Sequence, residues 1–393
     1  MALGVGLTAG QGIATVASMD RTHAHALSDR PPLDDPPELP LLEEVRHLIR
    51  QLFPDQGRDV RVVPLLGDAS DRRYYRVFLT PPADAIPSLV LMRLARPYAE
   101  GDLPFLNVQR YLALKQVPVP RVFRDDAAHG LVLLEDLGDL TLASAVHAAS
   151  DASIRRWYGE ALEILLTLQD PRAPISRDRC VAFRLAFDVE KFLWELDFFV
   201  THLLKQLCGR QLGSATEAAL RGQFWKLTAP LARQPRVLTH RDYHSRNLML
   251  HEGHLRVIDF QDARLGPCHY DLASLLYDSY VILPRDLRAQ LVADYLQRKG
   301  EMEGHHIDRE EFGCLFEYMA LQRNMKALGT FAFQATMRGN TRYIPSIQPT
   351  IAYLQENLAR HPELRVLGEI LDEHLFSVYP NVLATWLVDP PGE

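Results

Sequence analysis

The sequence predicts an α+β protein of two lobes, in which a small antiparallel β lobe precedes a larger helical lobe. Two patterns along the chain indicate this. Short runs rich in Val, Leu and Tyr, separated by turn residues, dominate residues 60–135. After residue 140, apolar residues recur instead at the i, i+3, i+4 spacing of helices. We therefore expect a first lobe over residues 41–135 and a second over 136–393, preceded by a leader at 1–40.

The predicted leader differs in composition from the rest of the chain. It is rich in Gly, Ala, Ser, Asp and Pro and ends in two proline-containing stretches. Because it offers too little apolar surface to offset the entropy of ordering, we predict that it is disordered. Neither a basic start nor an unbroken apolar stretch marks a signal peptide there, and Met19 is an alternative start of the protein.

The first lobe begins with a helix, predicted from the helical spacing of apolar residues over 41–53 and ended by Pro54. The pattern then changes to strands with turn residues between them. The predicted strands cover residues 60–66, 74–79, 88–94, 121–124 and 131–135. One further helix, at 104–114, is inserted between the third and fourth strands and is closed by Pro118 and Pro120.

The second lobe is predicted to be mostly helical, with a strand–loop–strand insert. The helices are expected at residues 153–169, 187–207, 214–233, 270–280, 283–299, 308–333 and 345–360. The strands of the insert are expected at residues 236–239, 248–251 and 255–258. The loops of this insert carry the residues that suggest chemistry.

Composition argues against several classes of protein. No run of about 20 apolar residues is present, so we expect no membrane span. A net charge of -7 argues against a nucleic-acid partner, because such binding depends on Lys and Arg. The four cysteines are widely scattered, which favours free thiols over a zinc site or a disulfide framework. We expect a cytoplasmic monomer with small-molecule partners.

The insert contains two carboxylates and an amide at a suggestive spacing. Asp242 lies two residues after His240, Asn247 follows five residues later, and Asp259 follows the last strand in an Ile-Asp-Phe sequence. Phosphoryl transfer needs an acceptor hydroxyl held in line, a cation across the phosphates and a place for the proton. Asp242 is therefore the expected catalytic residue, which orients the hydroxyl and accepts its proton. Asn247 and Asp259 supply the hard oxygen ligands that suit Mg²⁺.

This H-x-D-x-x-x-x-N and I-D-F pattern resembles the aminoglycoside phosphotransferase and choline kinase superfamily, as does the stretch Gly266-Pro267-x-x-Tyr270-Asp271-Leu272-Ala273. The resemblance implies a protein-kinase-like fold of two lobes, with ATP and Mg²⁺ in the cleft. It also implies that Asp271 is structural and steadies the catalytic loop. His240 is expected to hold this loop by hydrogen bonds.

Most of residues 41–372 show a closer resemblance, to bacterial amino-sugar anomeric kinases. The segments that carry it read GDASDRRYYRV from residue 67, LLEDLG from residue 133 and LQRNMKALG from residue 321. The resemblance implies ATP- and Mg²⁺-dependent phosphorylation of the anomeric C1 hydroxyl of N-acetylmuramate, N-acetylglucosamine or both, in peptidoglycan recycling. The residues alone leave other functions open: a kinase for choline, homoserine, an aminoglycoside or another sugar, a protein kinase, or a nucleotide-binding pseudokinase.

Two groups of residues are candidates for nucleotide contacts. The first is suggested by the residue types themselves, and the second is implied by the family resemblance. Ser70, Arg73 and Arg76, near the first turn, offer hydroxyl and guanidinium donors to phosphate. Backbone groups of Glu135 and Leu137, where the two lobes join, are implied to hydrogen-bond adenine.

One position departs from the superfamily pattern. Met92 stands where the superfamily usually has a Lys, and the following helix lacks the usual Glu partner. The two absences agree, because either charge alone and buried would be costly. We expect Arg76 or Arg93 to take over the phosphate contact, in preference to a pseudoenzyme. The choice between these two depends on the strand register.

Charged residues on the predicted helices of the second lobe are candidates for binding the acceptor. The default interpretation of Glu195, Asp197, Arg323 and Lys326 is that they form solvated charged faces of their helices. The functional alternative is that Glu195 or Asp197 binds sugar hydroxyls, while Arg323 binds a lactyl carboxylate or a phosphate.

Overall fold

The computed structural model describes residues 39–54, 59–65, 72–83, 86–99, 103–172 and 177–388. Residues 1–38 of the predicted leader lie outside these ranges, and so does Ser70. The chain divides into two compact units. The first contains the described residues up to Pro97 together with Phe123–Leu134, and the second contains Tyr98–Val122 and the chain from Glu135 onward.

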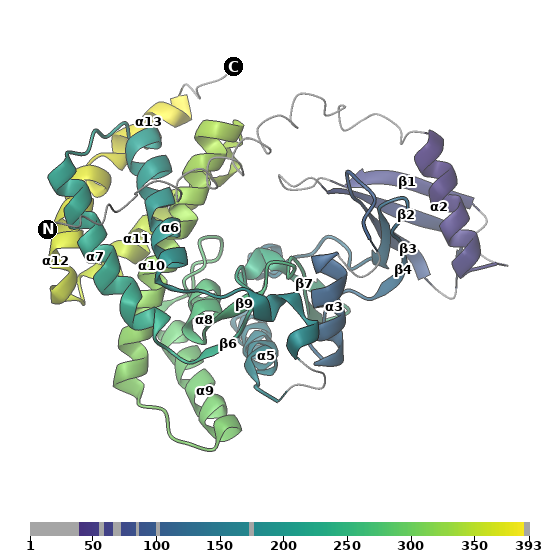
Figure 1. Cartoon of the computed structure of the whole chain (residues 1–393), viewed down its shortest axis with the longest axis horizontal. Coiled ribbons are helices and arrows are strands. Elements are labelled where there is room, and N and C mark those ends of the chain that lie inside the picture. Colours follow the sequence, from purple (N-terminus) through teal and green to yellow (C-terminus); the bar gives the residue numbers. More distant parts are fainter. Residues whose placement is uncertain are drawn as a thin grey trace, which may run out of the picture. The chain divides into compact units, whose positions relative to one another are not determined.

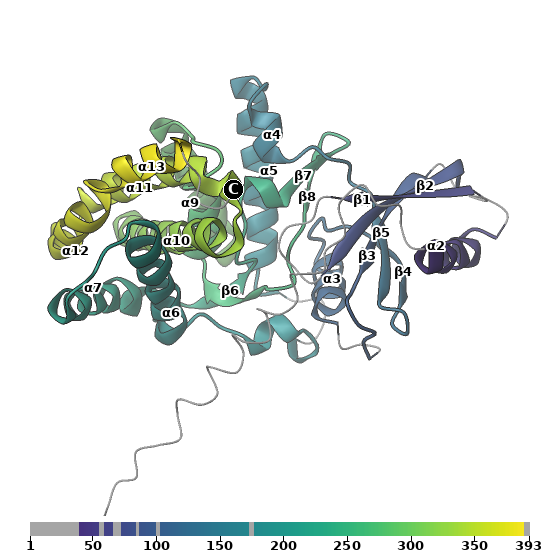
Figure 2. The same ribbon diagram turned by 90° about the horizontal axis from the view of Figure 1, so that it is seen from above.

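The first unit is a five-stranded sheet with a helix packed on one face (Figure 2). The strands are β1 (Asp59–Leu65), β2 (Arg73–Ala83), β3 (Ile86–Arg93), β4 (Val122–Asp126) and β5 (Leu131–Glu135), in the order β1-β2-β3-β5-β4. Helix α2 (Leu39–Leu52) is amphipathic, and its apolar face meets the sheet. Leu48 and Ile49 of α2 are buried with Val77 and Leu91 of the sheet. Burial of such a side chain contributes about 1.5–3 kcal/mol, which holds α2 in place.

The second unit is mostly helical (Figure 1). The longer helices are α3 (Pro104–Leu114), α5 (Asp151–Gln169), α6 (Val189–Phe199), α7 (Ser214–Ala232), α9 (Arg285–Glu303), α10 (Arg309–Arg338) and α11 (Ile347–Leu358). The shorter ones are α4 (Leu142–Val146), α8 (His269–Leu276), α12 (Arg365–Leu371) and α13 (Tyr379–Val388). Two segments continue α6 and α12 as π-helices, Val200–Leu207 and Asp372–Phe376.

Helix α10 packs against α6, α8 and α11 and is the longest helix among the described residues. The side chain of Asp308 caps its start, and Gly339 ends it with a φ of +63°. At Gly329 the neighbouring helix comes very close, since a Cβ there would lie 2.7 Å from the Cα of Phe199. This close packing brings polar residues of α6 and α10 together beside the candidate site.

Two small antiparallel sheets flank the candidate site. β6 (Arg236–Thr239) pairs with β9 (Arg264–Pro267), and β7 (Leu248–His251) pairs with β8 (His254–Val257). Strand β9 was not predicted from the sequence, because Gly266 and Pro267 are typical of turns. The glycine has a packing reason, since a Cβ at Gly266 would lie 2.8 Å from Cδ2 of Phe187.

The division into units differs from the predicted lobes at α3. We expected the helix at 104–114 in the first lobe, but it belongs to the helical unit because its contacts are there. Phe105 stacks on Phe260 with ring centroids 5.0 Å apart, and Asn107 Nδ2 donates to the carbonyl of Arg179 at 2.9 Å. The short helices α4, α12 and α13 were also not predicted, since so few residues carry little periodicity.

No helix in the described part of the chain is long and apolar enough to cross a bilayer. The four cysteines are free thiols; Cys180 and Cys208 are buried, and Cys314 is exposed.

Candidate active site

The catalytic loop follows β6, and the buried side chain of His240 shapes it. His240 Nε2 donates to the carbonyl of Ile258 at 2.9 Å, and Nδ1 accepts from the backbone N–H of Asp242 at 3.3 Å. Together these bonds place the ring proton on Nε2. Both nitrogens are therefore used to hold the loop, which is the structural role expected of His240.

Asp271, on α8, anchors the start of this loop. Its carboxylate accepts hydrogen bonds from the backbone N–H groups of His240 at 2.6 Å and Arg241 at 3.0 Å. Burial raises the pKa of Asp271, against the lowering effect of the nearby His240. Arg241 has a φ of +86°, a backbone conformation that residues with a Cβ rarely adopt. The bonds to Asp271 hold this strained turn, in the role that the resemblance implied.

A second buried carboxylate, Asp278, anchors the end of the loop and was not predicted. Its Oδ2 accepts from the N–H of Ser245 at 2.9 Å, and its Oδ1 from the N–H of Tyr280 at 2.9 Å. Burial raises the pKa of Asp278 to about 6, although its hydrogen bonds with Ser245 and Tyr280 lower it. The sequence contained one usable signal. Asp278 lies seven residues after Asp271, which in the predicted helix 270–280 would place both on one face. The observed α8 ends earlier, at Leu276, so Asp278 acts from the segment after it.

The predicted metal ligands, Asn247 and Asp259, lie beside each other. Asn247 Nδ2 donates to Asp259 Oδ2 at 3.4 Å and to the carbonyl of Asp242 at 2.8 Å. The N–H of Ile258 donates to the carbonyl of Asn247 at 3.0 Å, which joins the two segments. Asp259 has a φ of +64° and accepts from Gln261 Nε2 at 2.7 Å. The structure thus brings together the three residues that the spacing had placed at one centre.

The donor set of this pair suits a hard divalent cation that is shared with a nucleotide. Two donations through Nδ2 leave the Oδ1 of Asn247 as a ligand oxygen beside the carboxylate of Asp259. In the described ranges no group of three or more His, Cys, Asp or Glu side chains is placed to hold a metal ion. A site of one carboxylate and one amide oxygen therefore needs further ligands, and substrate phosphates and water are the usual ones.

Three cations surround the carboxylate of Asp242, and two of them come from α10. Lys326 Nζ lies 2.6 Å from Oδ1, Arg323 Nη2 lies 3.5 Å from the same oxygen, and Arg241 Nε lies 4.0 Å from Oδ2. Burial alone would raise the pKa of Asp242. Lys326, Arg323 and Arg241 outweigh burial and hold that pKa well below its ordinary range. Asp242 is therefore a carboxylate at neutral pH.

The default interpretation of Arg323 and Lys326 as a solvated charged face is wrong. The side chain of Arg323 is 6% exposed and that of Lys326 is 15% exposed. Arg323 donates to the hydroxyls of Tyr270 at 2.7 Å and Ser274 at 2.8 Å, and its guanidinium lies 4.6 Å over the ring of Tyr270. The guanidinium of Arg323 is therefore held by partners within the protein, and its role is to support the carboxylate of Asp242. The middle of α10 is enclosed by other helices, so a charged residue there needs an internal partner.

The two acidic candidates on α6 lie in different surroundings. Residues two apart on a helix differ in direction by about 200°. Glu195 is buried, and its Oε2 accepts from Gln322 Nε2 of α10 at 2.9 Å. Asp197 is 49% exposed and lies 3.4 Å from Arg221 of α7. Glu195 therefore belongs to the charged region around Asp242, whereas Asp197 belongs to the surface.

In the first unit, the strand register shows which arginine lies beside Met92. Tyr74 pairs with Met92, and Arg73 pairs with Arg93. Paired residues project to the same face of a sheet, and successive residues project to opposite faces. Arg76 therefore shares the face of the buried Met92, while Arg73 and Arg93 share the face on which α2 packs.

The residues expected to contact adenine lie at the end of β5 and just after it, in the second unit. The N–H of Glu135 donates to the carbonyl of Arg121 at 2.8 Å, and the N–H of Arg121 donates to Glu135 Oε2 at 3.0 Å. Gly138 has a φ of +77°, and its N–H donates to Asp136 Oδ1 at 3.0 Å. These bonds fix the backbone on both sides of Leu137, which is buried.

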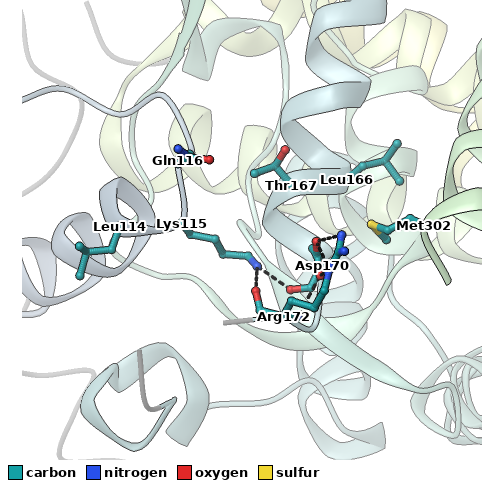
Figure 3. Close-up of a pocket in the computed structure, with 8 residues that line it drawn as sticks. All are labelled: Leu114, Lys115, Gln116, Leu166, Thr167, Asp170, Arg172 and Met302. Atoms are coloured by element: carbon teal, nitrogen blue, oxygen red, sulfur yellow. Dashed lines mark hydrogen bonds and ion pairs between the residues drawn. The ribbon is translucent and has the colours of Figure 1, made fainter. Parts of the chain in front are cut away.

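A separate cavity of about 580 Å³ lies beside the end of α3 and the end of α5 (Figure 3). Its lining residues are Leu114, Lys115, Gln116, Leu166, Thr167, Asp170, Arg172 and Met302. Lys115 Nζ already donates to the backbone carbonyls of Asp170 at 2.5 Å and Arg172 at 3.2 Å. The lining contains no predicted site residue, so this cavity is distinct from the candidate active site.

Comparisons with known proteins agree with this geometry. A family model described as the phosphotransferase enzyme family matches residues 61–310. An N-acetylmuramate/N-acetylglucosamine kinase of Pseudomonas aeruginosa is 33% identical over 312 residues, which are 79% of this chain and 87% of that protein. A protein of the same name from Neisseria meningitidis serogroup B is 31% identical over 337 residues, covering 84% of this chain and 95% of the relative.

Solved structures with low sequence identity support the fold. Choline kinase from Cryptosporidium parvum matches with a TM-score of 0.51 and 13% identity, over 83% of this chain and 98% of that chain. An ADP-bound aminoglycoside phosphotransferase matches with a TM-score of 0.50 and 16% identity, over 80% of this chain and 98% of that chain. The predicted kinase-like fold, with a small β unit and a larger helical unit, is confirmed.

Proposed function

The chain belongs to the phosphotransferase enzyme family, and from this premise we propose that it transfers the γ-phosphoryl group of ATP to the anomeric C1 hydroxyl of N-acetylmuramate and N-acetylglucosamine. The names of its relatives support the two sugars. The observation that carries the reaction is the ionised Asp242 beside Asn247 and Asp259. The resemblance seen in the sequence supports a role in peptidoglycan recycling, as a cytoplasmic monomer.

In this proposal Asp242 binds and orients the acceptor hydroxyl. Its Oδ1 is bound by Lys326, whereas its Oδ2 is 4.0 Å from Arg241 and is the oxygen suited to accept from the hydroxyl. The low pKa of Asp242 makes it a weak base, so proton transfer to it comes late in the reaction. An anomeric hydroxyl is more acidic than an ordinary alcohol, and positioning then contributes more than basicity.

Asn247 and Asp259 would hold Mg²⁺ in this proposal. The cation supplies charge neutralisation of the nucleotide phosphates when it is bound. The chain's part is to present the amide Oδ1 and the carboxylate in place. The Ile258–Asn247 hydrogen bond fixes the backbone, and Gln261 Nε2 orients the carboxylate of Asp259. The nucleotide contacts of Arg76, Glu135 and Leu137 complete the proposed set. Arg73 shares with Arg93 the sheet face on which α2 packs and is therefore not part of it.

Arg76 is the residue we assign to the phosphate contact that a Lys usually makes. Arg76 pairs with Val90, and Tyr74, two residues before it, pairs with Met92. Arg76 and Met92 are therefore close neighbours on the same face of the sheet. Arg93 lies on the opposite face, so its side chain projects away from the face on which Met92 replaces the usual Lys. The register thus supports Arg76 over Arg93, a choice that the sequence had left open.

The charges around Asp242 disfavour a cationic acceptor such as an aminoglycoside. Arg241, Arg323 and Lys326 all lie within 4.0 Å of its carboxylate. A polycationic antibiotic would meet repulsion there, whereas a neutral or anionic sugar would not. The same charges disfavour choline.

An ADP-release assay with Mg-ATP tests the proposal. The acceptors to compare are N-acetylmuramate, N-acetylglucosamine, glucose, choline and kanamycin. We expect saturable turnover on the two N-acetyl sugars and a product that has lost its free reducing end. Asp242→Asn is the matched control, because it keeps the side-chain shape and removes the charge.

Two other outcomes reject parts of the proposal. Turnover confined to choline, glucose or kanamycin would keep the phosphotransferase and reject the amino sugars. If none of the five acceptors is phosphorylated by protein that still binds Mg-ATP, the proposed reaction is rejected.

A further inference from the structure

We propose that Lys191 of α6 and Arg264 of β9 form a subsite for the carboxylate of an anionic acceptor sugar. This carboxylate subsite rests on the proposed function and deepens it, because the two proposed sugars differ by a lactyl ether that bears a carboxylate. The subsite would favour N-acetylmuramate over N-acetylglucosamine.

The position of Lys191 follows from the packing of α6 on α10. Lys191 and Glu195 are four residues apart and share one face of α6. Glu195 binds Gln322 of α10 at 2.9 Å, so this face looks toward α10. One turn after Gln322, Lys326 binds the carboxylate of Asp242. Lys191 thus lies on the face of α6 that is directed toward Lys326 and Asp242.

Arg264 reaches the same region from β9. Strand β9 pairs with β6, the strand that leads into the catalytic loop, and Arg264 pairs with Thr239 directly before that loop. Arg264 Nε donates to the carbonyl of Asp262, whose carboxylate lies 3.0 Å from Arg241. Its guanidinium lies 5.3 Å over the ring of Phe187, just before α6 begins. Arg264 is therefore close both to the catalytic loop and to the start of α6.

Most charges of this region are already matched within the protein. Arg323 and Lys326 bind Asp242, and Arg241 binds Asp262. Lys191 and Arg264 differ from them. Within the described ranges, neither makes a direct ion pair or hydrogen bond with a carboxylate side chain. Lys191 Nζ lies 3.7 Å over the half-exposed ring of Trp194, and Arg264 uses a backbone carbonyl and an aromatic face.

The electrostatics support an anionic ligand. The pKa of Lys191 is lowered to about 8, mainly by burial and also by the nearby Arg241, Arg264 and Lys326, against the raising effect of Glu195. The cations of the region therefore repel one another, and both Lys191 and Arg264 remain partly exposed. A carboxylate bound between them would relieve this repulsion and accept charge-assisted hydrogen bonds. Arg is well suited to this, because its planar guanidinium matches a carboxylate.

The test compares two acceptors with matched variants. The measured quantity is kcat/KM for N-acetylmuramate and for N-acetylglucosamine, with the wild type, Lys191→Met and Arg264→Met. We expect each variant to lower kcat/KM for N-acetylmuramate about 10-fold or more, mainly through KM, as for loss of a charge-assisted hydrogen bond. The value for N-acetylglucosamine should change less than about 2-fold, and Lys191→Arg should restore the preference.

Lys205→Met is the matched control, because Lys205 lies on the surface in an ion pair with Glu217 at 2.6 Å. An equal loss on both sugars in the two subsite variants would overturn the proposal, and so would no loss on either. Failure of the proposed function appears differently, as a wild type that phosphorylates neither sugar. Calorimetric titration with each sugar then decides: weaker binding of N-acetylmuramate by Lys191→Met than by the wild type supports the subsite, and equal binding overturns it.

Discussion

The catalytic loop and the carboxylate subsite differ in how the chain assembles them. The loop takes Asp242, Asn247 and Asp259 from one short stretch, and hydrogen bonds to its backbone fix them. The subsite takes Lys191 from α6 and Arg264 from β9, next to Lys326 of α10. The chemical step is therefore encoded by local spacing, whereas the choice of acceptor depends on the packing of distant elements. Substitutions in the loop should lower the turnover of every acceptor, whereas substitutions in the subsite should lower the turnover of N-acetylmuramate alone.

The strongest loss of activity is expected at Asp242 of the catalytic loop, and it should be the same for both sugars. Asp242→Asn removes the charge that orients the acceptor hydroxyl and receives its proton. We expect kcat to fall about 10²–10⁴-fold, the usual range for a positioned acid or base, and by the same factor on both N-acetyl sugars. Steady-state ADP release measures this, with Asp197→Asn on the exposed face of α6 as the control. A loss on one sugar only would mean that the loop itself selects the acceptor.

The hydrogen bonds from the catalytic loop to Asp271 are expected to contribute to the free energy of unfolding. Asp271→Ala leaves the buried N–H groups of His240 and Arg241 without acceptors. We expect the free energy of unfolding to fall by about 2–5 kcal/mol, because each buried unpaired donor costs about 1–3 kcal/mol. Urea denaturation measures this, and Asp271→Asn, which keeps one acceptor oxygen, should lose less. Asp197→Ala should stay within about 0.5 kcal/mol, as a surface change does. An Asp271→Ala value equally small would show that water or a moved loop satisfies these donors.

Lys326 lies between the catalytic loop and the carboxylate subsite, since it binds Asp242 and affects the pKa of Lys191. Lys326→Met leaves Asp242 without its nearest cation, at 2.6 Å. We expect kcat to fall about 10–100-fold, as for loss of a hydrogen bond between charged groups. The pKa of Asp242 should rise, since Lys326 is the strongest of the cations that lower it. The acid limb of the kcat/KM profile should therefore move to higher pH. Lys326→Arg should keep the wild-type profile; an unchanged profile in Lys326→Met would contradict the assigned pairing.

The predictability of the fold and site follows the same division. The spacing of Asp242, Asn247 and Asp259 predicted their common centre because one loop and one hairpin join them. The strands of the first unit were likewise predicted from local sequence, as short runs rich in Val, Leu and Tyr between turn residues, but the face of Arg76 required the register with β3. Lys326 was assigned to solvent because a sequence does not show that other helices enclose α10. Strand β9 was not predicted because its pairing with β6 is distant and its Gly-Pro pair is typical of turns.

The smallest expected effect is a pH dependence confined to the subsite. Lys191 is faced by Glu195 on its own helix, by Arg241 of the catalytic loop, by Arg264 of β9 and by Lys326 of α10. Burial lowers the pKa of Lys191 to about 8, so it is mostly charged at pH 7 and mostly neutral at pH 9. A carboxylate ligand stays ionised over that range and binds better to the charged lysine. The ratio of kcat/KM for N-acetylmuramate to that for N-acetylglucosamine should therefore fall about 3–10-fold from pH 7 to pH 9.

Taking the ratio cancels changes in Asp242 and the nucleotide site, which affect both sugars. Lys191→Arg should keep the ratio flat, because a guanidinium remains charged at pH 9. A wild-type ratio that is also flat would remove Lys191 from acceptor selection and leave Arg264 to be tested alone.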